Sequence, residues 1–173
     1  MTVQPFVPHS IFERFYNERV EAVLIGGLAA VLLGVPIITN DIDFCYNPSP
    51  DNTARLVRAL APLHPFLRVA RLSDEEARAL PFVWDERTVR DSPNLTLQTD
   101  AGPVDLLTSV PGVGDYAAVR SAAVTLDWRG IQAMVLDLPA LVAGKRATGR
   151  AKDLLALPQI EATLRLRNKD GEE

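Results

Sequence analysis

The segment 39–44, Thr-Asn-Asp-Ile-Asp-Phe, constrains this chain more than any other part of its sequence. Successive side chains of a strand point to opposite faces, so Asp41 and Asp43 share one face while Ile42 and Phe44 share the other. The apolar pair predicts a strand packed against a core. Two carboxylates side by side on such a strand are costly unless a positive group neutralises them. A divalent metal ion is the simplest such group, so the segment predicts a metal site.

A third aspartate completes the candidate site. Asp105 lies between Val104 and Leu106, and these apolar neighbours predict a strand rather than a solvated loop. If this strand pairs beside the one that carries Asp41 and Asp43, three carboxylates converge at one edge of the sheet. Such a cluster suits two Mg²⁺ ions about 3.5–4 Å apart, an arrangement that serves phosphoryl transfer. The alternative is a hairpin aspartate with an exposed side chain.

Gly26 and Gly27 follow the segment 20–25, which is rich in β-branched residues, and precede the apolar segment 28–33. Glycine lets backbone N–H groups approach an anion closely, and the start of a helix favours negative charge. A strand, two glycines and a helix therefore outline a phosphate site. Taken alone the pattern is more often a packing feature, and the acidic strand that follows strengthens the phosphate interpretation.

A cationic stretch near the C-terminus is the other concentrated feature. Lys145, Arg146, Arg150 and Lys152 lie within eight positions of a chain whose net charge is −4. Their local field suits a triphosphate or an RNA backbone. The alternative is a solvated link between two helices, in which Asp153 caps the second helix or pairs with a cation. The functional interpretation is preferred for Lys145 and stays open for the other three cations.

Composition excludes several other classes of protein. A pI near 5.2 argues against a protein that binds nucleic acid over its whole surface. The single cysteine, Cys45, excludes an internal disulfide and a cysteine-based zinc site, and His9 and His64 lack the spacing of helical metal ligands. No basic and apolar leader and no apolar run of membrane-spanning length are found, so no membrane association is expected and the cytoplasm is the expected location.

The hydrophobic pattern predicts one α+β domain. Helices are expected over residues 10–19, 28–33, 51–63, 73–80, 139–146 and 151–157, with a last one to about residue 167. Ser10, Asp51 and Ser73 are the expected N-caps. Hairpins are expected over residues 95–107 and 123–136. We expect a core over residues 1–138 and a helical extension over residues 139–173 packed on it.

These motifs resemble a known family. The chain is similar, over residues 20–157, to small bacterial nucleotidyltransferases of the DNA polymerase β superfamily, and most of all to the AbiEii-like toxin and minimal nucleotidyltransferase group. The resemblance implies a nucleotidyltransferase fold: a mixed β-sheet flanked by helices with a helical C-terminal portion. It also implies Mg²⁺-dependent transfer of a nucleoside monophosphate from a nucleoside triphosphate to an acceptor hydroxyl, with release of pyrophosphate. The motifs that carry it are Gly26-Gly27, Thr39 to Asp43, Val104 to Leu107, and Leu141 through Lys145-Arg146 to Lys152-Asp153-Leu154.

The resemblance assigns roles by position. Asp41 and Asp43 would hold the metal ions, and Asp105 would bind the catalytic metal beside the acceptor hydroxyl and help to deprotonate it. Asp153 would help to order its helix. The residues expected to bind nucleotide are Gly26, Gly27, Thr39, Lys145 and Arg146.

Two positions depart from the family's pattern. Ile37 stands where relatives often carry a basic residue, and Gly27 stands where many carry serine, so two contacts to phosphate or acceptor are lost while the metal ligands remain. The acceptor stays open among a tRNA end, a protein hydroxyl and a small hydroxylated molecule. A toxin would also have an antitoxin protein as its partner. The alternatives are a catalytically inactive nucleotidyltransferase-fold module that binds or regulates, and an unrelated α+β protein whose acids lie on its surface.

Overall fold

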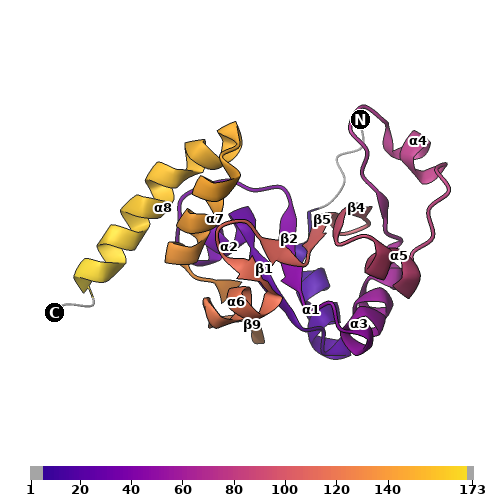
Figure 1. Ribbon diagram of the computed structural model, residues 1–173, viewed down its shortest axis with the longest axis horizontal. Helices are drawn as coiled ribbons and strands as arrows, with labels where there is room; N and C mark the ends of the chain where they lie inside the picture. Colours follow the sequence, from indigo (N-terminus) through magenta and orange to yellow (C-terminus); the bar gives the residue numbers. More distant parts are fainter. Residues whose placement is uncertain (1–5, 171–173) are drawn as a thin grey trace.

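The computed structural model describes residues 6–170, which form a mixed seven-stranded sheet flanked by helices (Figure 1). The strand order in the sheet is β3-β4-β5-β2-β1-β9-β8, and β6 and β7 form a separate ribbon of two strands. The strands are β1 (Ala22–Ile25), β2 (Ile42–Tyr46), β3 (Phe66–Leu67), β4 (Asn94–Thr99), β5 (Gly102–Leu107), β6 (Ser109–Val110), β7 (Gly114–Asp115), β8 (Ala123–Trp128) and β9 (Ile131–Leu136). The helices are α1 (Pro8–Glu18), α2 (Gly26–Leu32), α3 (Pro50–Leu60), the 3₁₀ turn η1 (Ala61–Leu63), α4 (Asp74–Arg78), α5 (Glu86–Asp91), α6 (Tyr116–Ser121), α7 (Leu138–Thr148) and α8 (Ala151–Asp170).

Strand β2 lies in the middle of this sheet. It pairs antiparallel with β1 on one side and parallel with β5 on the other, and this register sets Asp43 opposite Asp105. Both predicted hairpins are confirmed, because β4 pairs antiparallel with β5 and β8 with β9. The α+β prediction, with a mixed sheet flanked by helices, is therefore confirmed.

The apolar alternation of β2 anchors the acidic strand in the core. Ile42 and Phe44 are 0% and 2% exposed. The Phe44 ring contacts two rings of α1, with its centroid 5.4 Å from that of Phe12 and 4.6 Å from that of Phe15. Burying these aromatic side chains fixes the pleat of β2, so the intervening residue Asp43 has to face the other way.

Two of the predicted N-caps are wrong. Helix α1 begins at Pro8, so Ser10 lies inside its first turn and its hydroxyl donates to the Val7 carbonyl. Helix α3 begins at Pro50 and is capped by Ser49, which leaves Asp51 in the first turn. In both cases a proline takes the first helical position, where its fixed φ is favourable and its missing N–H is no loss.

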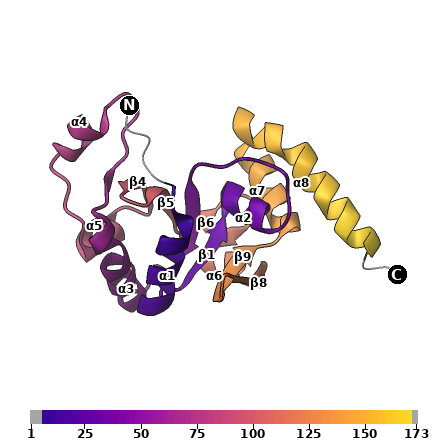
Figure 2. The same ribbon diagram turned by 180° about the vertical axis from the view of Figure 1, so that it is seen from behind.

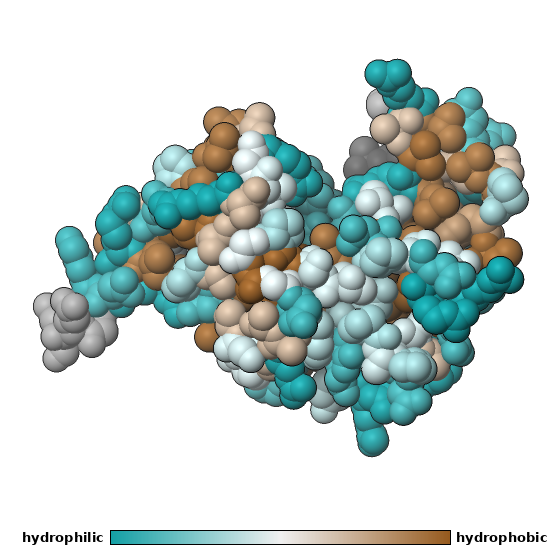
Figure 3. Space-filling model, viewed as in Figure 1, coloured by the Kyte–Doolittle hydropathy of each residue, from teal (hydrophilic) through white to brown (hydrophobic). Residues whose placement is uncertain are grey.

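The chain between β3 and β4 forms short helices and loops. Ser73 caps α4, and both halves of its predicted capping box with Glu76 are present. In Figure 3 a hollow separates this segment from helices α7 and α8. The apolar side chains that the segment leaves exposed are Val69, Leu72, Leu80 and Val83.

Helices α7 and α8 pack against each other, and Leu138, Leu141 and Ile160 join the main hydrophobic core. The predicted break after residue 157 is wrong, because α8 continues through Pro158. Leu157 and Ile160 are buried, whereas Pro158 between them is exposed. The packing of the buried face stabilises the helix and offsets the backbone hydrogen bond that proline cannot make. Figure 2 shows the C-terminal half of α8 running away from the sheet. Within the described part of the chain, no helix combines the length and apolarity needed to cross a membrane.

Candidate active site

Three aspartates from two neighbouring strands meet at one point. Asp43 lies on β2, Asp41 directly precedes this strand, and Asp105 lies opposite Asp43 on β5. One carboxylate oxygen from each aspartate lies within 4.8 Å of the other two. The predicted convergence is therefore confirmed. We call Asp41, Asp43 and Asp105 the carboxylate cluster.

The cluster is electrostatically unfavourable without a cation. Burial raises the pKa of Asp43 to about 7, and the neighbouring charges of Asp41 and Asp105 add to this effect. Burial also raises the pKa of Asp105, although Arg68 partly opposes the change. Oxygen ligands at this spacing suit a hard divalent ion, which would replace the mutual repulsion by attraction. The donor set therefore fits the predicted Mg²⁺.

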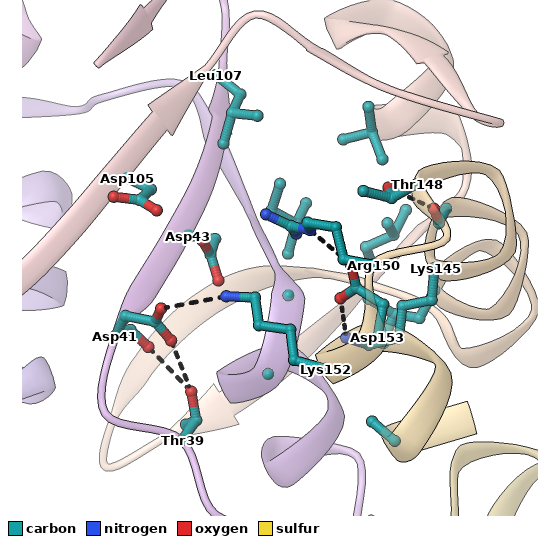
Figure 4. A pocket seen from close by; sticks show the side chains of 18 of the residues that line it. Thr39, Asp41, Asp43, Asp105, Leu107, Lys145, Thr148, Arg150, Lys152 and Asp153 are labelled. Carbon is teal, nitrogen blue, oxygen red and sulfur yellow. Dashed lines mark hydrogen bonds and ion pairs between the residues drawn. The ribbon is translucent and has the colours of Figure 1, made fainter. Parts of the chain in front are cut away.

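The cluster faces a cavity of about 460 Å³ (Figure 4). Asp41, Asp43 and Asp105 line it on one side, and residues of α7, of α8 and of the α7–α8 link line it on the other. The cavity also has an apolar part, formed by Ile25, Ile37, Ile38, Pro103, Leu107, Val110, Pro111, Leu136, Ala140, Leu141 and Ala156.

Two glycines at the start of α2 let the chain pass close to the acids. Gly26 has a φ of +70°, and a Cβ there would collide with the carboxylate of Asp43. A Cβ on Gly27 would lie 2.7 Å from Oγ1 of Thr39. This hydroxyl donates to Oδ1 of Asp41 over 3.0 Å. Thr39 therefore occupies the space that a side chain at position 27 would need. Both glycines and Thr39 line the cavity.

Cations from α7, from α8 and from the link between them face the carboxylate cluster across the cavity. Lys145 and Arg150 both pair with Asp153, over 3.1 Å and 2.7 Å, and Asp153 is 3% exposed. Burial alone would raise the pKa of Asp153, but the hydrogen bonds from Arg150 and Lys145 hold it below its ordinary value. Nζ of Lys152 lies 4.0 Å from Oδ2 of Asp41. The sequence left two structural roles open for Asp153, as a helix cap or as the partner of a cation, and the structure shows the second.

Arg146 is not brought to the cavity. It pairs with Glu161 over 2.6 Å, its side chain is 64% exposed, and it is absent from the cavity lining. Helix α7 turns Lys145 and Arg146 to different sides, because adjacent helical residues do not share a face.

Arg68 is the site residue that sequence reasoning missed. Its Nη2 donates to Oδ1 of Asp105 over 2.8 Å, and its side chain lines the cavity. Arg68 directly follows β3, an edge strand of two residues that is too short to show a hydrophobic alternation. Only the pairing of β3 with β4 brings Arg68 to the site.

The mixed sheet and its flanking helices match the fold of a solved structure that is described as a nucleotidyltransferase. Comparison with known proteins supports this at the level of the fold. A solved structure from Thermotoga maritima, a "putative nucleotidyltransferase", is similar with a TM-score of 0.51 and 19% sequence identity, over 96% of this chain and 91% of that chain. No protein-family model and no curated protein matches the sequence.

Proposed function

We propose that this chain is an Mg²⁺-dependent nucleotidyltransferase, which transfers a nucleoside monophosphate from a nucleoside triphosphate to an acceptor hydroxyl and releases pyrophosphate. The observation that carries the proposal is the meeting of three carboxylates, with oxygens within 4.8 Å of one another, at a cavity whose opposite wall is cationic. The fold similarity to the Thermotoga maritima structure points to the same class of reaction.

In this proposal Asp41, Asp43 and Asp105 hold the metal. When bound, Mg²⁺ neutralises phosphate charge and lowers the pKa of a coordinated hydroxyl. Asp105 accepts the proton of the acceptor hydroxyl, which its position in the carboxylate cluster at the cavity allows. The raised pKa of Asp43 means that its proton leaves when the cation arrives, so metal binding is pH-dependent.

The cationic wall is suited to the triphosphate. Lys145 and Arg150 are held in place by the buried Asp153, so their N–H groups are pre-ordered before any ligand enters. Lys152 lies nearest to the carboxylate cluster, 4.0 Å from Asp41. These three side chains supply charge for the phosphates.

The test is incubation of the purified chain with each labelled nucleoside triphosphate, Mg²⁺ and a cell extract. We expect label to appear in an RNA, protein or small-molecule fraction and to disappear with Asp43→Asn, while the circular dichroism spectrum stays that of the wild type. Full labelling by Asp43→Asn would contradict the assignment. Metal-dependent nucleotide binding without product, across a broad panel of acceptors, would instead support a binding or regulatory module.

The closer resemblance to AbiEii-like toxins motivates a separate proposal, in which the chain arrests growth and an antitoxin protein relieves the arrest. Induced expression of the wild type would then slow growth, and Asp43→Asn would not. Equal growth of both strains at equal protein levels would contradict the toxin role without touching the transfer reaction.

A further inference from the structure

Cationic side chains reach the carboxylate cluster from two separate sides. Lys145, Arg150 and Lys152 come from the α7–α8 side, where Figure 4 shows them across the cavity from Asp105. Among the described residues that line the cavity, Arg68 is the one cation that comes from the other side, at the end of β3. The triphosphate proposed above uses the α7–α8 side, so Arg68 has no part in that role.

Arg68 belongs to a row of side chains that runs across the sheet. Its backbone N–H donates to the carbonyl of Thr96 over 2.9 Å, continuing the pairing of β3 with β4. Thr96 is opposite Asp105, and Asp105 is opposite Asp43. Directly opposed residues in a sheet share one face. The row therefore reads Arg68, Thr96, Asp105, Asp43, with Arg68 at the end away from the α7–α8 cations.

The guanidinium of Arg68 has hydrogen-bonding capacity to spare. It donates to Oδ1 of Asp105 through Nη2, and its side chain is 35% exposed. A guanidinium carries five N–H donors in a rigid fork, so one contact with Asp105 leaves others for a ligand. This fork matches the oxygens of a phosphate and repels an ammonium group.

Resting on the proposed function, we propose that Arg68 binds a phosphate group of the acceptor, next to the hydroxyl that reacts. Asp105 is the aspartate assigned to the acceptor hydroxyl, and Arg68 is the cation held against it on the side away from the triphosphate. In this arrangement, a group that the acceptor carries next to its reacting hydroxyl lies over Thr96 and Arg68. The acceptor is then a hydroxyl compound that carries a phosphate, and acceptors with ammonium groups at that point are rejected.

Binding of matched probes tests this without turnover. The probe is a fluorescein-labelled tetraribonucleotide with a free 3′-hydroxyl, whose last linkage is either a phosphodiester or an uncharged methylphosphonate. Fluorescence anisotropy gives the dissociation constants for the wild type, Arg68→Gln and Arg71→Gln. Arg71 lies in the same segment, is exposed and does not line the cavity, so Arg71→Gln controls for net charge.

We expect the wild type and Arg71→Gln to bind the phosphodiester probe about tenfold more tightly than the methylphosphonate, as one charge-assisted hydrogen bond allows. We expect Arg68→Gln to lose this preference, and Arg68→Lys, which keeps the charge without the fork, to keep part of it. An equal preference in Arg68→Gln and the wild type would rule out a polynucleotide end as the group that Arg68 binds.

A small-molecule arm identifies the source of the phosphate. Chemical-shift titration with glycerol 3-phosphate and with glycerol shows whether a small phosphate monoester binds at Arg68 on its own. A response to glycerol 3-phosphate that Arg68→Gln removes supports a small phosphorylated acceptor. Arg68-dependent binding of the oligonucleotide alone supports a polynucleotide end. Independence of Arg68 in both arms would overturn the proposal.

The readouts also separate this proposal from the proposed function. If the wild type transfers nucleotide and Arg68→Gln changes kcat but leaves the acceptor KM unchanged, the phosphate contact is refuted. The proposed nucleotidyltransferase function is then retained. If no labelled nucleotide is transferred by the wild type while the probe preference depends on Arg68, the proposed function is refuted and the phosphate contact stands.

Discussion

Asp43 carries its charge at a position where burial, Asp41 and Asp105 all oppose ionisation. Its pKa is about 7 in the folded chain against an ordinary value of 3.8, so between these pH values the folded state binds more protons than the unfolded state. The stability of the metal-free protein therefore falls as the pH rises from about 4 to about 7. A bound cation would remove this penalty.

Replacing the charge should stabilise the metal-free protein. We expect Asp43→Asn to raise the free energy of unfolding at pH 8 by up to about 4 kcal/mol, since each pKa unit is worth about 1.4 kcal/mol. Near pH 4 the gain should be small, because Asp43 is then protonated in the folded state. Urea denaturation at both pH values with EDTA measures this, with Asp51→Asn, an exposed acid, as control. A loss of stability at pH 8 would contradict the argument.

Lys145 serves both the fold and the proposed function, because it pairs with the buried Asp153 and also lines the cavity. We expect Lys145→Met to raise the KM for nucleotide and also to lower stability by about 1–3 kcal/mol, since Asp153 then keeps Arg150 alone. Steady-state kinetics and thermal denaturation measure both. Arg165→Met, on an exposed position of α8, should change neither. An unchanged nucleotide KM in Lys145→Met would count against the phosphate role.

At the scale of elements, the sequence predicts the acidic strands well and their surroundings less well. Apolar neighbours of Asp43 and Asp105 identify β2 and β5 as buried strands, whereas the pairing of these strands was only a condition of the predicted site and is given by the structure. Arg68 could not be found in this way, because β3 has two residues and no pattern of its own. The N-cap at Asp51 was mispredicted because Pro50 takes the first helical position.

Helix α8 tests how far packing overrides local propensity. Pro158 lies inside the helix with its ring exposed, while Leu157 and Ile160 are buried. We expect Pro158→Ala to raise stability by about 1–3 kcal/mol, because it restores a helical N–H without disturbing the core. Thermal denaturation followed by circular dichroism measures the change. A loss of stability would indicate that α8 is broken at Pro158 in solution.

At the scale of the whole molecule, folding concentrates charges that are dispersed along the chain. The sheet collects acids from positions 41 to 105, and the cavity adds cations from positions 68 to 152, although the net charge is only −4. The Thermotoga maritima structure, at 19% identity over 96% of this chain, shows a similar fold formed by mostly different side chains.

The central claim is that Asp41, Asp43 and Asp105 form one site for a divalent cation. Isothermal titration of the wild type with Mn²⁺ and Mg²⁺ at pH 7, repeated in buffers of different ionisation enthalpy, measures both affinity and proton release. We predict binding with release of a fraction of a proton from Asp43, and a loss of affinity of about tenfold or more for each of Asp41→Asn, Asp43→Asn and Asp105→Asn. Wild-type affinity in all three variants would contradict the claim.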